Sequence, residues 1–233
     1  MDEKRLAVYL QSLAAADSPF VESVAAQAVA EHVPVVRRET AALLKTLIVL
    51  KGPQNILEVG TAVGYSALLM AENAPAGCSI VTIEKSEERA RQAQLHFGLA
   101  GRQEQITLLK GEAADILKDL TGCWDFIFMD AAKGQYIHFF DEIFRLLAPG
   151  GVLVSDNVLQ DGTILESRFA LKRRGRTIHS RMREYLFTLT HHEGLTTAVL
   201  PLGDGVAVSV KTEADSRIGR SITAKSGGEK GRQ

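Results

Sequence analysis

Five short apolar runs, separated by stretches of helical period, constrain the fold of this chain more than any other feature of its sequence. They read NILEV, SIVTIE, QITLLK, WDFIFMD and GVLVSD, and they fall between residues 55 and 156. Runs of this length, rich in branched and aromatic residues and bounded by turn-forming residues, are typical of β-strands. Because parallel strands need helical crossovers, the alternation predicts an α/β fold in which helices cover both faces of a mostly parallel sheet.

The segments on either side of this alternation predict how the domain begins and ends. Residues 3–50 hold three helix-like patterns, which predict a helical N-terminal region. Residues 157–175 read as a loop-rich insertion, and residues 176–192 read as one more helix. The run LTTAVLPLGDGVAVSVK, residues 195–211, predicts two antiparallel strands joined by a Pro/Gly turn at the edge of the sheet. We therefore expect one domain over residues 1–211.

Composition bounds the rest of the chain and its surroundings. Residues 212–233 are polar and rich in Gly, Ser and Lys, which predicts a disordered tail. The formal net charge of −1 gives no overall attraction to nucleic acid or to a membrane surface. Cys78 and Cys123 stand in unrelated contexts, and no apolar stretch is long enough to cross a bilayer. We expect a soluble, cytoplasmic protein without a membrane partner.

The first predicted strand runs into LEVGTAVGYS, a glycine-containing turn that follows a carboxylate. Gly60 and Gly64 allow the backbone to turn tightly and to approach a ligand closely. A dinucleotide fingerprint would have a glycine in place of Ala62, and a pyrophosphate would lie badly beside Glu58. S-adenosylmethionine (SAM), which is cationic and lacks phosphate, suits this turn better, and Glu84 after the second strand is placed to bind ribose hydroxyls. The alternative is that these residues serve only the turn and a solvated strand end.

Two later strands end in MDAAK and SDN, so Asp130, Asp156 and Asn157 should emerge side by side at the ligand-binding edge of the sheet. Carboxylate and amide oxygens suit Mg²⁺ or Ca²⁺, and Mg²⁺ keeps positions open for substrate oxygens. Lys133 follows Asp130 by about one helical turn, which makes it a candidate general base near a divalent cation. The alternative is that the acids only form turns and that Lys133 is their surface partner.

Four motifs, LEVGTAVGYS, VTIEKSEE, FMDAAKGQY and VLVSDNVL, together closely resemble those of the bacterial metal-dependent O-methyltransferases of the catechol and caffeoyl-CoA type, over residues 36–211. The resemblance implies a Rossmann-like SAM methyltransferase fold with a seven-stranded, mostly parallel sheet, an antiparallel C-terminal hairpin and N-terminal helices. It also implies a homodimer formed through those helices.

The same resemblance implies roles for individual residues. Mg²⁺ would be held by Asp130, Asp156 and Asn157, with Lys133 and Asp130 as catalytic residues. Ala113 stands where the family usually has a serine, so a side-chain hydrogen bond to adenine is not expected there. The implied cofactor-binding residues are Val36, Glu58, Gly60, Ser66, Glu84, Glu112, Ala113 and Asp130.

A more specific resemblance, to tRNA 5-hydroxyuridine methyltransferases, rests on DNVLQDG, RRGRTIHSRMREYLFTLTHH and LPLGDGVAVS. It implies methylation of a wobble 5-hydroxyuridine in the anticodon loop to 5-methoxyuridine. Residues 172–183 hold six Lys or Arg and no acid, and such a helix face would give salt-sensitive contacts to phosphates. The predicted tRNA-binding residues are Arg37, Arg38, Lys172, Arg173, Arg174, Arg176, His179 and Arg183.

Two other functions fit parts of the pattern. A catechol presents two adjacent oxygens to a metal ion, as 5-hydroxyuridine does, so the first alternative is a small-molecule O-methyltransferase acting on catechol-like phenols. In that case the basic segment is only a solvated helix face. The second alternative is a non-catalytic SAM-binding or RNA-binding module, which leaves Lys133 unexplained.

Overall fold

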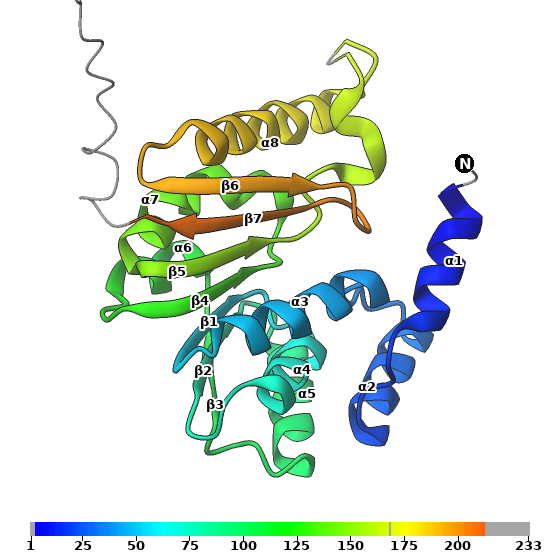
Figure 1. The fold of residues 1–233 in the computed structure, drawn as a ribbon, viewed down its shortest axis with the longest axis vertical. Helices are drawn as coiled ribbons and strands as arrows, with labels where there is room; N and C mark the ends of the chain where they lie inside the picture. Colours follow the sequence, from blue (N-terminus) through cyan, green and yellow to red (C-terminus); the bar gives the residue numbers. More distant parts are fainter. Residues whose placement is uncertain (1–2, 168, 213–233) are drawn as a thin grey trace, which may run out of the picture.

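The computed structural model describes residues 3–167 and 169–212, and its centre is a seven-stranded sheet in the order β3-β2-β1-β4-β5-β7-β6 (Figure 1). The first five strands pair in parallel, whereas β7 runs antiparallel to both β5 and β6. This confirms the predicted Rossmann-like fold with its C-terminal hairpin. The strands are β1 (Asn55–Val59), β2 (Ser79–Glu84), β3 (Ile106–Lys110), β4 (Trp124–Met129), β5 (Leu147–Ser155), β6 (Leu195–Leu200) and β7 (Val206–Lys211).

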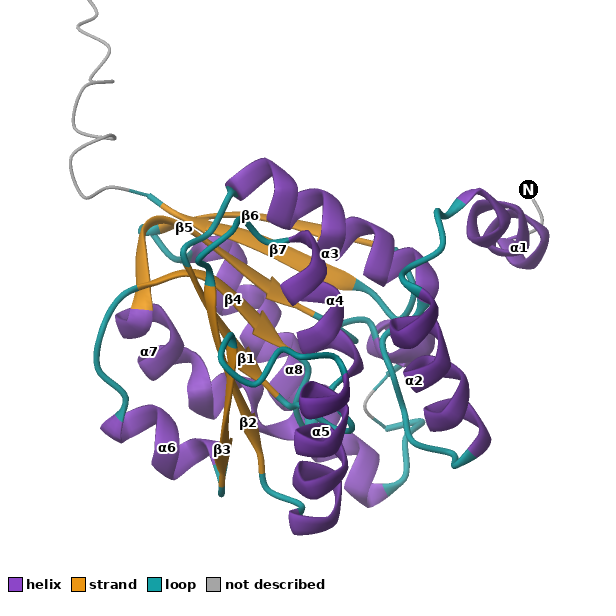
Figure 2. Ribbon diagram, turned by 90° about the horizontal axis from the view of Figure 1, so that it is seen from below, coloured by secondary structure: helices purple, strands orange, loops and turns teal. Residues whose placement is uncertain are grey.

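Helices cover both faces of the sheet, as Figure 2 shows. Helices α2 to α5 pack on one face and α6 to α8 on the other, so the central strands are buried on both sides. The helices are α1 (Glu3–Leu13), α2 (Pro19–Ala30), α3 (Arg38–Lys51), α4 (Tyr65–Asn73), α5 (Glu87–Leu99), α6 (Ala113–Asp119), α7 (Tyr136–Leu146) and α8 (Arg173–His191), with 3-10 turns η1 (Lys133–Gln135) and η2 (Gln160–Leu165).

Side chains of the central strands alternate between two separate cores. In β4, Phe126 and Phe128 point toward α3 and α4, while Ile127 and Met129 point toward α7 and α8. All four are fully buried. Uninterrupted apolar runs of this kind are what a strand needs when both of its faces are covered, which is why the sequence pattern located these strands.

The starts of β5 and α8 differ clearly from those that the sequence predicts. Strand β5 begins at Leu147 rather than Gly151, because the register between β4 and β5 shifts and lets the Pro-Gly-Gly segment join the sheet. Helix α8 begins at Arg173 rather than residue 176, so it takes in part of the predicted insertion. The predicted tail lies outside the described residues, except for Thr212.

Helix α1 lies farther from the sheet than the other helices do (Figures 1 and 2). Its side chains Val8, Tyr9 and Leu13 are each at least 60% exposed. Helix α1 therefore carries apolar surface outside the core, and the homodimer through the N-terminal helices stays a prediction.

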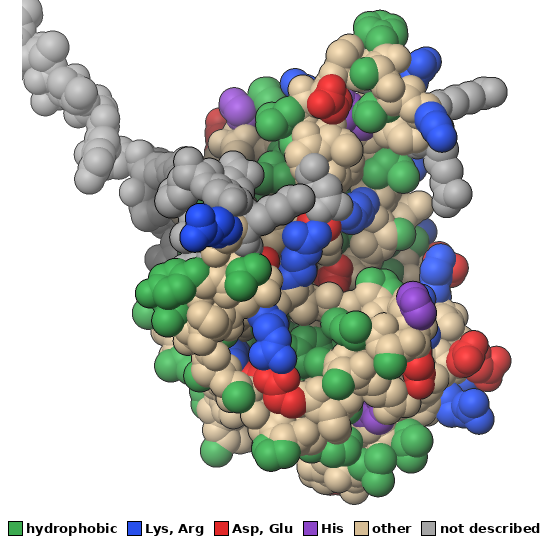
Figure 3. Space-filling model, turned by 90° about the vertical axis from the view of Figure 1, so that its right-hand side faces the viewer, with side chains coloured by type: hydrophobic (Ala, Val, Ile, Leu, Met, Phe, Trp, Pro, Cys, Tyr) green, Lys and Arg blue, Asp and Glu red, His purple; other side chains and the backbone are tan. Residues whose placement is uncertain are grey.

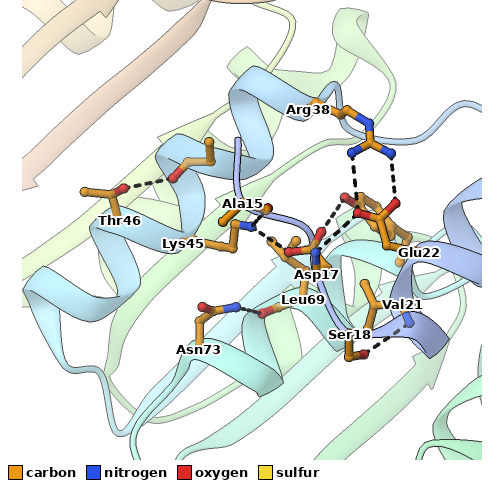
Figure 4. A network of polar contacts seen from close by, with 12 residues as sticks. Ala15, Asp17, Ser18, Val21, Glu22, Arg38, Lys45, Thr46, Leu69 and Asn73 are labelled. Carbon is orange, nitrogen blue, oxygen red and sulfur yellow. Dashed lines mark hydrogen bonds and ion pairs between the residues drawn. The ribbon is translucent and has the colours of Figure 1, made fainter. Parts of the chain in front are cut away.

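A polar network at Asp17 fixes the segment between α1 and α2 against α3 and α4 (Figure 4). The Asp17 carboxylate accepts a hydrogen bond from Lys45 Nζ at 2.6 Å and another from Tyr65 Oη at 3.3 Å. Glu22 accepts from the Asp17 backbone at 3.2 Å and from Arg38 at 2.8 Å. The network therefore positions both α2 and the start of α3, which lies beside the cavity described below.

Replacing Asp17 by Ala should lower the free energy of unfolding by about 1–3 kcal/mol, because Lys45 loses its partner in a place where water replaces it poorly. The Lys45 and Asp17 side chains are only 19% and 8% exposed. Urea denaturation would measure the change. Asp119→Ala, an exposed acid at the end of α6, should change stability by less than about 0.5 kcal/mol, and an equally small effect of Asp17→Ala would contradict the assigned role.

Candidate active site

A cavity of about 670 Å³ opens at the carboxyl ends of β1, β2, β4 and β5. Figure 3 looks onto this end of the sheet, where Lys and Arg side chains border a hollow. From β1 the chain continues to β2 and β3 on one side of the sheet, and it then crosses to β4 and β5 on the other side of β1. Such a switch in strand order leaves a crevice in open α/β sheets. The sequence-predicted residues that line the cavity are Val36, Arg37, Gly60, Ser66, Glu84, Glu112, Ala113, Asp130, Lys133, Asp156 and Asn157.

Strand register explains why residues distant in the sequence meet here. Val59 of β1 pairs with Met129 of β4, and Met129 pairs with Ser155 of β5. The next residues along therefore leave the sheet together. The ladder continues for one more step, since the backbone N–H of Asp130 donates to Val59 and that of Asp156 donates to Met129, both at 3.0 Å.

The turn after β1 brings its backbone against neighbouring elements. Gly60 has a φ of +106°, and a Cβ there would lie 2.2 Å from the carbonyl oxygen of Asp130. Ala62 also has a positive φ, of 46°, and its N–H donates to Glu84 Oε2 at 2.9 Å. Glu84 Oε1 accepts from the Ser86 N–H at 2.8 Å. Two backbone donors thus hold the Glu84 carboxylate at the cavity wall, where its remaining lone pairs could accept from ribose hydroxyls.

Glu58 lies behind the cavity wall rather than on it. Its side chain is fully buried, and Oε2 accepts from Thr82 Oγ1 at 2.5 Å. Among the described residues, Oε1 has no hydrogen-bond partner. Burial raises the pKa of Glu58 to about 7, with further increases from Asp130 and Glu84, while nearby hydroxyls offset part of the rise. Glu58 therefore adds a poorly compensated acid beneath the cavity.

Asp130, Asp156 and Asn157 lie together, as the sequence predicted they would. Asn157 has a φ of 60°, and it donates from its backbone to Asp156 Oδ1 at 2.7 Å and from Nδ2 to Asp130 Oδ1 at 3.0 Å. Burial raises the pKa of Asp130 to about 6. Burial, followed by repulsion from Asp130, raises the pKa of Asp156 to about 7.

These three residues fit a hard divalent cation. Two neighbouring carboxylates that burial and mutual repulsion destabilise would gain from a positive charge between them. No group of three or more His, Cys, Asp or Glu suited to a metal occurs in the described part of the chain, so a metal site here would combine the two carboxylates with the Asn157 amide. Asn157 turns its amide nitrogen toward Asp130 here, and a flip of that amide would present its oxygen instead.

Lys133 opens η1 and faces this acidic group. Its charge lowers the pKa of both Asp130 and Asp156, which places its amine near the two carboxylates. Its Nζ lies 3.7 Å from Oδ2 of Asp204, which also lines the cavity. An amine with this placement could exchange a proton with a hydroxyl held beside the acids.

Sequence reasoning missed two residues of the site. Asp204 lies in the LGDG turn between β6 and β7, a segment whose sequence predicts a turn but no role for the acid. Tyr136 is fully buried, and its hydroxyl lies 3.1 Å from the carbonyl oxygens of both Met129 and Asp156, which ties α7 to the ends of β4 and β5. Its position in FMDAAKGQY, one turn after Lys133, was the available signal.

The predicted tRNA-binding residues separate into different surroundings. Arg37 pairs with Asp204, and Arg38 pairs with Glu22. We call the exposed residues Lys172, Arg176 and Arg183 the cationic cluster; Lys172 directly precedes α8, and the other two belong to it. Arg173 and Arg174 begin that helix, and their side chains lie outside what the structure describes.

His179, predicted among the tRNA-binding residues of an exposed helix face, is buried instead. His179 is 3% exposed, and it lies one turn before the buried Met182. Arg183, on the next turn, reaches the carbonyl oxygen of Ile164 at 3.5 Å. The 3-10 turn η2 therefore covers this side of α8. The sequence pattern could not reveal that cover, because it treated the insertion as loop.

Known proteins resemble the chain along most of its length. The model of the family described as O-methyltransferase matches residues 11–212. The chain belongs to the O-methyltransferase family. A structure from Staphylococcus aureus described as a caffeoyl-CoA O-methyltransferase is 30% identical with a TM-score of 0.80, and the match covers 90% of this chain and 99% of that one. A Bacillus cereus O-methyltransferase in complex with SAH is 25% identical with a TM-score of 0.78, covering 89% and 97% of the two chains.

Among curated relatives, a catechol O-methyltransferase from Niastella koreensis is 39% identical over 127 residues, which is 53% of this chain and 58% of that protein. The chain spans 58% to 65% of the length of the first three curated relatives that it matches. None of the helices described is long and apolar enough to cross a membrane.

The free energy of unfolding of Glu58→Gln, relative to that of wild type, should increase as pH rises. Its pKa is 4.5 ordinarily and about 7 here, so between these values the folded form holds a proton that the unfolded form has lost. Wild-type stability therefore falls with pH in this window, and the variant lacks that loss. Between pH 5 and pH 8 the unfolding free energy of the variant minus that of wild type should increase by on the order of 2–3 kcal/mol.

Urea denaturation of both proteins at the two pH values would measure this difference. Glu88→Gln, an exposed acid of α5, is the matched control and should show almost no shift. An equal response of the two variants would mean that Glu58 titrates normally.

Proposed function

We propose that this protein is a Mg²⁺-dependent O-methyltransferase that transfers the methyl group of SAM to the 5-hydroxyl of 5-hydroxyuridine at the tRNA wobble position, which gives 5-methoxyuridine. The observation that carries the chemistry is the meeting of Asp130, Asp156, Asn157 and Lys133 in one cavity, at the end of the sheet where α/β folds bind ligands.

Several features of the cavity support SAM as the methyl donor. Its volume of about 670 Å³ suits a ligand of nucleotide size. Glu84, held by two backbone donors, faces the cavity where a ribose would need an acceptor. The wall also has a surplus of acid, which favours a ligand that carries an ammonium and a sulfonium. Membership of the O-methyltransferase family points the same way.

In the proposed mechanism, the chain itself orients the acceptor and moves one proton. Asp130, Asp156 and Asn157 would hold Mg²⁺, which when bound would draw electron density from two adjacent acceptor oxygens and ease loss of the hydroxyl proton. Lys133 Nζ, as the neutral amine, takes that proton on its lone pair and becomes an ammonium. The acceptor oxygen then bonds to the methyl carbon as the sulfur–methyl bond breaks, and the electron pair of that bond stays on sulfur. The cavity contributes mainly by alignment.

An RNA acceptor is supported by the cationic cluster Lys172, Arg176 and Arg183. Arg176 and Arg183 belong to α8, and Lys172 directly precedes it. Arg181 of the same helix donates to the carbonyl oxygen of Gly134, one residue from Lys133. Phosphates bound along this part of α8 would therefore lie near the cavity, and a base splayed out of a single-stranded loop could enter it.

A small phenol is the second candidate for the acceptor. The 39% identity to a catechol O-methyltransferase favours it, and a catechol offers the same pair of adjacent oxygens as 5-hydroxyuridine. The two candidates share the metal ligands and the base. They differ in whether the cationic cluster takes part in binding.

Changing Lys133 to Ala should lower kcat by about 10²- to 10⁴-fold, with much less effect on SAM affinity, because the variant lacks the proton acceptor but keeps the cofactor wall. Asp156→Ala or addition of a chelator should abolish turnover. Steady-state kinetics and calorimetric SAM titration would measure these effects. Asp141→Ala, an exposed acid of α7, is the control, and full activity in chelator would exclude the metal role.

A strain that lacks this protein should accumulate 5-hydroxyuridine in its tRNA in place of 5-methoxyuridine, which nucleoside analysis by mass spectrometry would detect. In vitro, RNA affinity should fall steeply with salt. The triple alanine variant of the cationic cluster should reduce the log–log salt slope by about one for each phosphate that it no longer binds. Arg91→Ala on α5 should not alter the slope. Unchanged tRNA in the deletion strain, together with turnover of catechol, would favour the small phenol.

A further inference from the structure

Asp204 connects two sides of the cavity through its two carboxylate oxygens. Oδ2 lies 3.7 Å from Lys133 Nζ, and Oδ1 pairs with the guanidinium of Arg37, just before α3. The Asp204 side chain is only 11% exposed. The Lys133 and Arg37 side chains are more open, at 34% and 49% exposed, so the carboxylate acts from a nearly buried position on two partly hydrated cations.

The backbone around Asp204 is held by the segment that follows β5. The Asp204 carbonyl accepts from the N–H of Leu159 at 2.8 Å, and the Gly205 carbonyl accepts from the N–H of Val158 at 2.9 Å. Gly205 has a φ of +88°, and a Cβ there would lie 2.2 Å from Leu159 Cγ. The turn therefore packs directly against the chain that follows Asn157, so Asp204 keeps a defined position relative to the proposed metal ligands.

Among the described residues, three acids interact with Lys133, and two of them have another proposed task. Its charge acts on Asp130 and Asp156 as well as on Asp204. When the first two carboxylates hold a divalent cation, their attraction for the lysine is offset by the cation. Asp204 is then the acidic neighbour left to orient the amine.

We propose that Asp204 is a positioning residue for Lys133, one that aims the amine at the acceptor hydroxyl and stabilises the ammonium formed when the proton arrives. This inference rests on the proposed function for the role of Lys133, but not on which acceptor is used. It follows the general arrangement in which a third group orients a catalytic base. Asp204 does not itself gain or lose a proton in the step.

A purely structural role for Asp204, exerted through Arg37, makes a different prediction. In that case Arg37→Ala would reproduce the effect of losing Asp204. If Asp204 acts through Lys133, Asp204→Asn should lower kcat by about 10- to 100-fold with little change in SAM affinity. Arg37→Ala should lower kcat by less than about threefold and should act mainly on the KM of the acceptor.

A double-mutant cycle tests whether Asp204 acts through Lys133. In a Lys133→Ala background, adding Asp204→Asn should cause less than about a twofold further loss of kcat, because the group it positions has gone. Asp204→Glu should restore part of the activity, and Asp141→Asn is the matched control for loss of an acid. The proposal would be overturned if the kcat losses of Lys133→Ala and Asp204→Asn multiplied in the double variant. It would also be overturned if Arg37→Ala alone lowered kcat as much as Asp204→Asn does.

A second measurement needs no turnover. Acylation of lysines by a limiting amine-reactive ester, quantified by peptide mass spectrometry on the metal-free protein, reports how firmly each amine is held. Lys133 should react at least about threefold faster in Asp204→Asn than in wild type, since it loses the nearby negative charge. Lys85, whose side chain is 64% exposed, should react equally in both. An unchanged Lys133 rate would overturn the proposal.

The two arms separate failure of this inference from failure of the proposed function. If tRNA is not methylated but catechol is, the cycle is measured with catechol, and Asp204 is tested as before. If neither acceptor is methylated, the proposed function fails while the labelling result still decides whether Asp204 holds Lys133.

Discussion

The crowding of carboxylates at one end of the sheet governs the rest of this structure. Glu58 and Asp156 are buried and Asp130 is partly buried, the pKa values of all three are raised, and Glu84 and Asp204 lie beside them. Parallel strands in register make this crowding unavoidable, because residues that end adjacent strands leave the sheet together. Burying charge without full compensation is unfavourable, so the arrangement persists only where ligands or neighbouring cations return the energy.

The compensation that the chain supplies is partial and specific. Backbone N–H groups serve Glu84, a threonine hydroxyl serves one oxygen of Glu58, and Lys133 is shared among acids. None of these neutralises Asp130 and Asp156 together. A cationic cofactor and a divalent ion are the ligands that would complete the balance, which is why site geometry and electrostatics support the same pair of ligands.

The sequence predicted the sheet well because its strands are buried on both faces and leave uninterrupted apolar runs. It also predicted that Asp130, Asp156 and Asn157 meet, since strand ends are determined by topology. It could not place Asp204, because the position of a turn residue depends on packing of the β6–β7 turn against Leu159. The predicted exposure of His179 was wrong for a related reason. The helical period identifies the faces of α8, but it does not show which face the insertion covers.

Helix α8 unites the chemistry and the proposed recognition of RNA in one rigid element. Tyr185 on its packed face is fully buried, and its hydroxyl lies 2.7 Å from Ser155 Oγ, directly before Asp156. Arg181 holds the carbonyl oxygen of Gly134, directly after Lys133. The helix is thus anchored to both halves of the site, and its cationic cluster keeps a set distance from them. An acceptor bound by that cluster would be positioned relative to the base and the metal ligands without any movement of the core.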